Sequence, residues 1–317
     1  MFRNDKSKGV VLLNIEGNLI MSNLRNNFIL FLEQRKSFLL GISILFFTFL
    51  VFVDLVGGKW SSLENSLSNL SKFFWESLWP PDWRVIEARD YPVCRSSIEV
   101  TCSTAYIGIV ETLKMAFVAT ILGFVISLPL AIFSSRNLYS DKIAIPTRII
   151  LAAMRTLPSI IWAILFVVMV GLGPIAGVLA MAFYTVGYLG KLQYEAIEGL
   201  SNSPLDAARA MGLENIEIVE RVVIPESANN LISQILFMFE YNVRQGSIIG
   251  IVGAGGLGED LFLYYDAQMY QRVIALLIVL FSVVVIIDFL SIKARSYFVD
   301  DATFKSPSLI VNLFRGK

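Results

Sequence analysis

The sequence predicts an all-α membrane protein with six transmembrane helices. Of its 317 residues, 56% are apolar and only 16% are charged, a balance too apolar for a typical soluble protein. Several uncharged runs approach the roughly 20 residues that a helix needs to cross a bilayer. Lysine and arginine are spread unevenly among the segments between those runs, and this distribution predicts the side of the membrane on which each segment lies.

The first 56 residues divide into a polar tail and a first span. Residues 1–37 contain no apolar run followed by a small-residue cleavage site, so we expect no cleavable signal peptide. From Met21 the tail can form either an amphipathic helix on the inner membrane surface or a flexible segment, and Met21 is itself a candidate translation start. Residues 38–56 form the first predicted span because they begin with 16 uncharged residues.

Residues 57–105 form a predicted extracytoplasmic segment. Leucine and phenylalanine repeat every three or four positions from Leu63 to Leu78, and three tryptophans lie at the end of this pattern. The combination is typical of a helix at a membrane interface. Cys94 and Cys102 fall in the same segment, where a disulfide between them and two separate thiols both remain open.

Five further apolar runs lie within residues 106–299 and complete the predicted membrane domain. The third and fourth spans are separated only by residues 171–173, so they should form a tight hairpin, and residues 300–317 follow as a C-terminal tail. The predicted spans are residues 115–133, 148–170, 174–190, 228–252 and 273–292.

The positive residues predict that both termini are cytoplasmic. With that orientation, 17 lysine and arginine residues fall in inside segments and only six in outside segments. Inner loops carry such an excess in multi-spanning membrane proteins. The loop between the fourth and fifth spans therefore lies in the cytoplasm.

That loop contains a short amphipathic segment, residues 203–225, with the features of a docking element. Ser203 can cap a helix that begins with Pro204, and Gly212 can end it. The alanines between them allow another backbone to come close. Pro225 closes the segment.

The spacing in this segment resembles the EAA motif of ABC importer permeases, which couples to an ATPase subunit. Asp206, Ala207 and Ala208 stand where the family has E-A-A, Gly212 follows after three residues, and Pro225 ends the apolar tetrapeptide that begins nine residues later. The resemblance assigns these five residues to ATPase coupling. The alternative is an ordinary cytoplasmic helical hairpin.

The composition excludes several other chemistries. The chain has no histidine and two cysteines, which removes histidine general-base catalysis and most zinc sites, and we expect neither catalytic nor metal-binding residues. It also lacks the G-x-x-x-x-G-K-[ST] phosphate loop, so any ATP must bind to another subunit. Residues 253–258 match G-x-G-x-x-G, but without a surrounding βαβ unit we interpret them as a flexible extracytoplasmic loop.

Charged residues in the fifth span are candidates for a substrate pathway. Glu240 and Arg244 stand four residues apart around Asn242, at a depth where charges normally face a bundle interior or a water-filled cavity. A mutually neutralising ion pair explains the two charges equally well. Asp288 and Arg155 are expected near the inner boundary, where interhelical pairing or snorkelling explains them.

Several separated motifs resemble the permease of phosphonate ABC importers. The likeness extends over roughly residues 106–299, with its clearest stretches at residues 155–190, 239–244 and 250–258. It implies the type I ABC importer permease fold with a cytoplasmic EAA coupling helix.

The same resemblance implies the partners and the function. It implies a homodimer in the cell inner membrane, two ATPase subunits that use ATP and Mg²⁺, and an extracytoplasmic substrate-binding protein. This chain would bind no cofactor, and no nucleic-acid partner is expected. The implied function is translocation of phosphonate, phosphite or a related phosphorus oxyanion. The alternatives are an ABC permease for another small solute such as an amino acid, an ion-coupled secondary transporter, and, least of all, a membrane enzyme.

Overall fold

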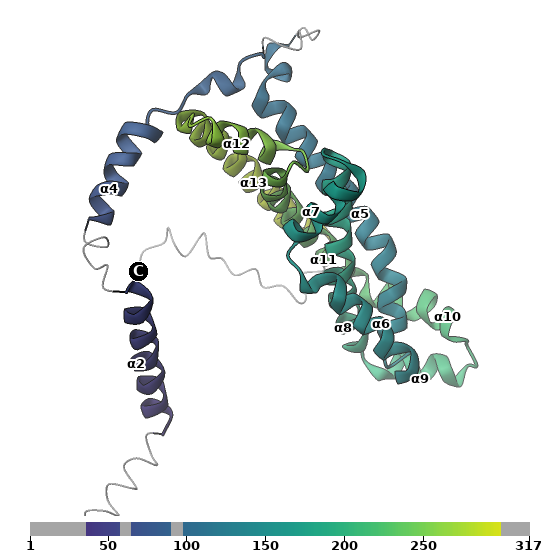
Figure 1. The fold of residues 1–317 in the computed structure, drawn as a ribbon. Helices are drawn as coiled ribbons and strands as arrows, with labels where there is room; N and C mark the ends of the chain where they lie inside the picture. Colours follow the sequence, from purple (N-terminus) through teal and green to yellow (C-terminus); the bar gives the residue numbers. More distant parts are fainter. Residues whose placement is uncertain (1–35, 58–64, 90–97, 299–317) are drawn as a thin grey trace, which may run out of the picture. The chain divides into compact units, whose positions relative to one another are not determined.

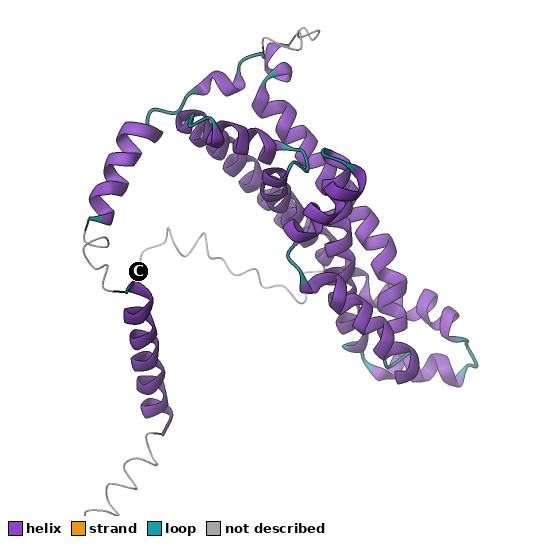
Figure 2. Cartoon of the chain, in the orientation of Figure 1, coloured by secondary structure: helices purple, strands orange, loops and turns teal. Residues whose placement is uncertain are grey.

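A computed structural model describes residues 36–57, 65–89 and 98–298. The described residues are helical, with no strand among them (Figures 1 and 2). The chain divides into two compact units, Met1–Phe73 and Phe74–Lys317, and we consider each separately. The expectations for residues 1–35 and for the tail 300–317 lie outside the described residues, as does Cys94.

Two helices of the first unit lie within the described residues. Helix α2 (Lys36–Val56) covers the first predicted span, and its apolar stretch runs from Leu40 to Leu55. Helix α4 (Ser66–Phe73) is amphipathic, and its leucines are exposed, as a helix at a membrane interface requires.

The second unit is a helical bundle that begins with short helical turns. Helix α8 packs against α5, α6 and α7, while α11 packs against α5, α8 and α13. Figure 1 shows α9 and α10 at one end of this bundle and α12 at the other. The elements are η1 (Phe74–Leu78), η2 (Trp83–Ile86), η3 (Glu99–Cys102), α5 (Thr104–Ser134), α6 (Asp141–Thr156), α7 (Ser159–Val170), α8 (Pro174–Glu198), α9 (Asn202–Ala210), α10 (Asn215–Ile218), η4 (Val219–Val223), α11 (Ile224–Ile249), η5 (Gly250–Val252), α12 (Leu257–Asp266) and α13 (Tyr270–Phe298).

The described residues contain four helical stretches long and apolar enough to cross a membrane. The bent pair α6 and α7 makes a fifth if it counts as one span, and α2 contributes the shorter apolar helix. The all-helical membrane architecture is therefore confirmed. The count of six stays a prediction.

The third predicted span is broken. Helices α6 and α7 meet at an angle of 87° around Leu157 and Pro158. Proline has no backbone N–H to continue the helix and disfavours helical geometry in the residue before it, so Leu157 takes an extended conformation, with φ −98° and ψ 140°. The sequence showed the interruption but not its angle.

Small residues bring the helices of the bundle close together. A Cβ atom on Gly123 of α5 would lie 2.3 Å from a methyl carbon of Thr185 on α8. One on Gly187 of α8 would lie 2.8 Å from the backbone oxygen of Leu151 on α6. Membrane helices associate through such close packing because lipid supplies no hydrophobic force between them.

The glycine-rich stretch after α11 is packed, which corrects the interpretation of residues 253–258 as a flexible loop. Gly253, Gly255 and Gly256 adopt positive φ angles and turn the chain sharply. Gly258, in the first turn of α12, then lies directly against the backbone of Ser247 and Gly250. The six glycine-rich positions thus form a tight turn against the bundle.

A short segment before α5, residues 82–85, packs against the end of the bundle at which α12 lies. Asp82 accepts hydrogen bonds from Arg84 and from Arg272 of α13, the latter at 3.1 Å. Val85 is buried against α12 and α13, in a cluster with Leu257 and Leu276. Cys102, which follows in this region, is disulfide-bonded in the structure.

Asp260 should make stability depend on pH. Burial raises the pKa of Asp260 to about 6, although Arg89 opposes the rise with an ion pair at 2.9 Å, and Glu259 and Glu111 add to it. Because an unfolded Asp titrates near pH 4, this group contributes stability at low pH that is lost as the pH rises through about 6. We expect the melting temperature of the detergent-solubilised chain to be higher at pH 5 than at pH 7.5, with a smaller difference in Asp260→Asn. An unchanged pH profile in the variant would contradict this role.

Candidate functional site

The predicted docking segment forms two short helices at one end of the bundle. Helix α9 begins at Asn202 after the N-cap residue Ser201, two positions earlier than predicted from Ser203 and Pro204. No side-chain hydrogen bond caps this end, so the predicted cap by Ser203 is wrong. Asp206 instead forms an exposed ion pair with Arg209 at 3.1 Å, one turn along the same helix.

Gly212 ends α9 as predicted. Its φ of +81° lies in the left-handed region that favours glycine, and its N–H donates to the carbonyl of Arg209. The N–H of Leu213 then reaches back to the carbonyl of Ala208. No atom lies within 4 Å of the position where a Cβ on Gly212 would stand, so this turn faces open space.

Pro225 does not close the segment. It lies in the first turn of α11, where the missing N–H costs little, and the preceding residues form the π-helical turn η4, Val219–Val223. The chain therefore runs from α10 into the fifth span without a break, and a movement of α10 would pass directly into α11.

The docking segment has a buried side and an exposed side. Leu205 and Ala208 are each 1% exposed and pack in a cluster with Ile197, Ile218 and Val223. On the opposite side, the exposed positions include two large apolar side chains around the Gly212 turn. These exposed residues are Asp206, Ala207, Ala210, Met211, Gly212 and Ile216. Of the alanines assigned to coupling, Ala207 thus faces outward while Ala208 packs inside the chain.

Polar contacts connect this segment to the membrane helices. Arg209 donates to the carbonyl of Asn137 in the turn between α5 and α6, and Asn137 donates to the carbonyl of Ile197 at 2.8 Å. Glu198, at the end of α8, pairs with Arg148 of α6. We call Asn137, Arg148, Glu198 and Arg209 the anchor. The sequence analysis missed it because its members are far apart along the chain.

Loss of the Glu198 charge should weaken the anchor. Arg148 and Glu198 are only 22% and 28% exposed, so Glu198→Gln leaves a largely desolvated guanidinium without its carboxylate. We expect destabilisation of about 1–2 kcal/mol, measured as a lower melting temperature. Glu195→Gln is the matched control on the same helix, since the exposed Glu195 pair with Lys191 at 3.4 Å should contribute less than about 1 kcal/mol. Equal effects of the two variants would argue against the anchor.

The three candidates for a substrate pathway, Glu240, Asn242 and Arg244, form hydrogen bonds or ion pairs with neighbouring helices. Asn242 is 1% exposed and donates to the hydroxyls of Thr120 at 2.9 Å and Thr185 at 3.0 Å, which links α11 to α5 and α8. Glu240 pairs with Arg295 of α13 at 3.1 Å and with Arg244 at 3.5 Å.

Arg244 also contacts Asp288 of α13, at 3.5 Å. This is the interhelical pairing expected for Asp288. None of the three pathway candidates lines the cavity described next, and their role in transport stays a prediction.

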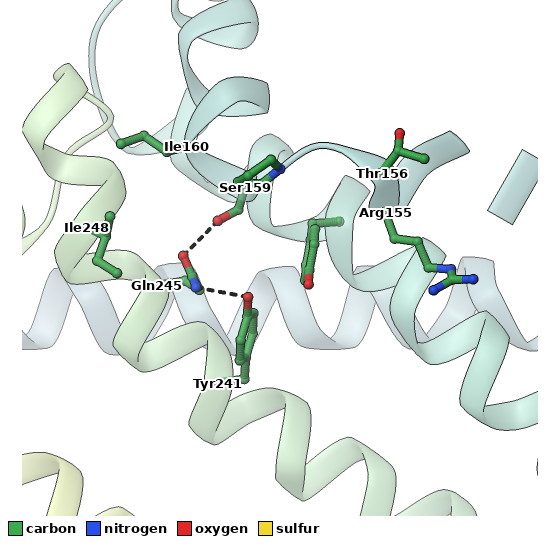
Figure 3. Close-up of a pocket in the computed structure, with 9 residues that line it drawn as sticks. Arg155, Thr156, Ser159, Ile160, Tyr241, Gln245 and Ile248 are labelled. Atoms are coloured by element: carbon green, nitrogen blue, oxygen red, sulfur yellow. Dashed lines mark hydrogen bonds between the residues drawn. The ribbon is translucent and has the colours of Figure 1, made fainter. Parts of the chain in front are cut away.

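A cavity of about 430 Å³ lies at the break between α6 and α7, bounded by residues of α8 and α11. Figure 3 shows Arg155 at one side and, at the other, a chain of hydrogen bonds through Gln245. Ser159 donates to the Gln245 carbonyl oxygen at 2.7 Å, and the Gln245 amide donates to the Tyr241 hydroxyl at 2.9 Å. The polar lining residues are Arg155, Thr156, Ser159, Tyr184, Tyr241 and Gln245.

Stacked aromatic rings extend from this cavity towards the α9 end. Tyr184 and Tyr241 stack with ring centres 5.6 Å apart, and Tyr188 stacks on both one turn further along. Phe237 stacks on Tyr188 at 6.2 Å. These rings present a continuous aromatic surface between α8 and α11.

Comparison with known proteins gives consistent matches. A family model described as binding-protein-dependent transport system inner membrane component matches residues 123–291. The chain is 38% identical over 194 residues to the putative phosphite transport system permease protein HtxC of Stutzerimonas stutzeri, a match that covers 61% of this chain and 69% of that protein. It is 36% identical over 187 residues to the phosphate-import permease protein PhnE of Mycolicibacterium smegmatis, covering 59% of this chain and 35% of that protein.

A solved structure shares the fold. The inward-facing MetNI methionine ABC transporter contains a chain that matches with a TM-score of 0.54 and 25% identity. The match covers 61% of this chain and 94% of that chain. The arrangement of α5 to α13 is thus one that ABC importer permeases adopt.

Proposed function

Because the chain belongs to the binding-protein-dependent transport system inner membrane component family, we propose that it is the translocation subunit of an ATP-driven importer of phosphonate, phosphite or a related phosphorus oxyanion. The observation that carries the substrate class is the identity of 38% over 194 residues with a protein named as a phosphite permease. A second such relative, the phosphite permease PtxC, is 34% identical over 191 residues.

The proposed assembly has the composition that the family implies. Two copies of this chain span the inner membrane with their termini in the cytoplasm, two ATPase subunits use ATP and Mg²⁺, and a binding protein delivers the ligand from outside. In this assembly the exposed side of the docking segment contacts the ATPase. Its small residues and the two exposed apolar side chains, Met211 and Ile216, suit a surface that another subunit covers.

The mechanism follows from the way the segment is attached. Closure of the ATPase dimer on ATP moves the docking helices, and the anchor and the unbroken passage from η4 into α11 carry that movement to the membrane helices. The bundle then opens its cavity outward to receive ligand from the binding protein. ATP hydrolysis and product release reverse the movement.

Uptake experiments test the proposal. The chain, expressed with its ATPase and binding protein in cells that lack other phosphorus-oxyanion uptake, should import labelled phosphite or a small phosphonate. Import should persist when a protonophore collapses the proton gradient and stop when cellular ATP is depleted. Import that follows the proton gradient would support a secondary transporter instead.

An ABC permease for another solute is the second candidate. It is favoured by the match to the choline transport system permease protein OpuBB of Bacillus subtilis, at 24% identity over 179 residues. Choline and methionine are therefore included as labelled solutes. Uptake of either in place of phosphite and phosphonate would overturn the proposed substrate.

A further inference from the structure

Arg155 is an unpaired cation beside a cavity in the membrane domain. Within the part of the chain that the structure describes, no carboxylate lies within salt-bridge distance of Arg155. Its Nε is buried and has no hydrogen-bond partner. The interhelical pairing expected from the sequence does not account for Arg155, because no carboxylate among the described residues pairs with it.

The cavity beside Arg155 has the charge and the donors of an anion site. Its lining contains one positive side chain and no carboxylate. The hydroxyls of Tyr184 and Tyr241 add donors, whereas those of Thr156 and Ser159 already donate to the carbonyl oxygens of Ala153 and Gln245. The Tyr241 oxygen accepts from the Gln245 amide.

The break between α6 and α7 adds a helix N-terminus to this cavity. Helix α7 has 12 residues, starts at Ser159 in the cavity wall, and has no side-chain cap at its N-terminus. The N-terminus of a helix carries partial positive charge and unpaired N–H groups, which favour an anion. Broken membrane helices that aim such an end at an anionic solute are a recurring device in transporters.

We propose that the cavity at the α6–α7 break is a transit site for a tetrahedral phosphorus oxyanion, in which Arg155 supplies the charge and the tyrosine hydroxyls and the α7 N-terminus supply hydrogen bonds. The choice of phosphorus rests on the proposed function. The preference for an anion rests on the cavity alone. Its volume of about 430 Å³ lies within the roughly 300–1,000 Å³ of small-molecule sites.

A positively charged solute would be repelled by the charge of Arg155 in this cavity. The faces of Tyr184 and Tyr241 can attract a quaternary ammonium group, but no carboxylate offsets the guanidinium charge within the lining. The competing account of Arg155 is that it balances the negative C-terminal end of α6, in whose last turn it lies. In that account the residue is structural and no ligand depends on it.

Binding to the full-length chain in nanodiscs separates these accounts. The probes are labelled inorganic phosphate and labelled phosphite, with a small phosphonate and choline as competitors. We expect saturable binding that the phosphonate displaces and choline does not. Arg155→Gln should weaken binding about 10- to 100-fold, and Arg155→Lys, which keeps the charge but not the forked donors, should weaken it less.

Two further variants control for charge and folding. Gln245→Glu places a carboxylate in the cavity at unchanged size and should reduce binding at least as strongly as Arg155→Gln. Lys142→Gln removes one positive charge from the same helix at an exposed position outside the cavity, and should bind as the wild type does. Gel filtration and melting temperature show whether each variant is folded.

Uptake by the complete transporter makes the outcomes distinguishable. Wild-type binding and uptake in folded Arg155→Gln would overturn the site while leaving the proposed function intact. Absence of phosphorus-oxyanion binding to the wild-type chain would overturn it as well. If the chain binds phosphate in an Arg155-dependent manner but the assembled transporter imports no phosphorus compound, the anion site stands and the proposed function falls.

Discussion

Gly212→Asp is expected to abolish uptake while the chain still reaches the membrane in normal amounts. The substitution meets no atom within 4 Å inside the chain, and the left-handed conformation, φ +81°, costs Asp only about 1 kcal/mol, so the fold should survive. The new charge instead stands on the exposed side of the docking segment, next to Met211, where the ATPase is proposed to sit. Uptake, membrane abundance and co-purification of the ATPase are the measurements.

Gly57→Asp provides a matched control for this experiment. Gly57 also adopts a positive φ, +55°, and among the described residues a Cβ there would lie near a backbone oxygen, that of Asp54, at 3.8 Å. The same change of residue type in the same kind of backbone conformation, but outside the docking segment, should leave uptake near the wild-type rate. Normal uptake in Gly212→Asp would overturn the assignment of this turn to ATPase coupling.

Gly258→Ala is expected to cause the largest loss of stability. An added Cβ would lie 2.1 Å from the backbone oxygen of Ser247 and 3.0 Å from the Cα of Gly250. Because these are backbone atoms, no side-chain rotation relieves the clash, and α12 must shift away from the end of α11. Overpacking of this kind costs about 1–3 kcal/mol or more, so we expect a clearly lower melting temperature and a smaller monodisperse fraction in gel filtration.

Gly41→Ala is the comparison for Gly258→Ala. Gly41 lies within helix α2 and has no atom within 4 Å of the position of a Cβ, so alanine should be neutral or slightly stabilising there. A wild-type melting temperature in Gly258→Ala would mean that the contact between α12 and the end of α11 is not maintained.

Features that depend on neighbouring residues were predictable from the sequence. The apolar runs identified the long helices, because a predominantly apolar stretch of about 18 residues has few alternatives to a membrane span. The glycine that ends α9 was predictable, since a left-handed residue at a helix end is encoded locally. Its start was not, because Ser201 and Ser203 are equally good caps by sequence.

Features that depend on distant residues were not predictable. A mutual ion pair was one of two interpretations of Glu240 and Arg244, and that pair is present at 3.5 Å. Glu240 lies closer to Arg295, 55 residues away, and so also ties α11 to α13. Gly258 was predicted to lie in a flexible loop, because the glycine motif carries no information about Ser247, against whose backbone Gly258 packs.

The sequence by itself determined that this protein is a helical membrane protein, because composition, periodicity and local turn chemistry specify spans and helix ends. The permease family and the docking role of residues 203–225 were implied by the resemblance of separated motifs. Only the tertiary structure decided which charges are neutralised and which are not. Pairing depends on distances between helices, and those distances leave Arg244 bridged to two carboxylates and Arg155 with none among the described residues.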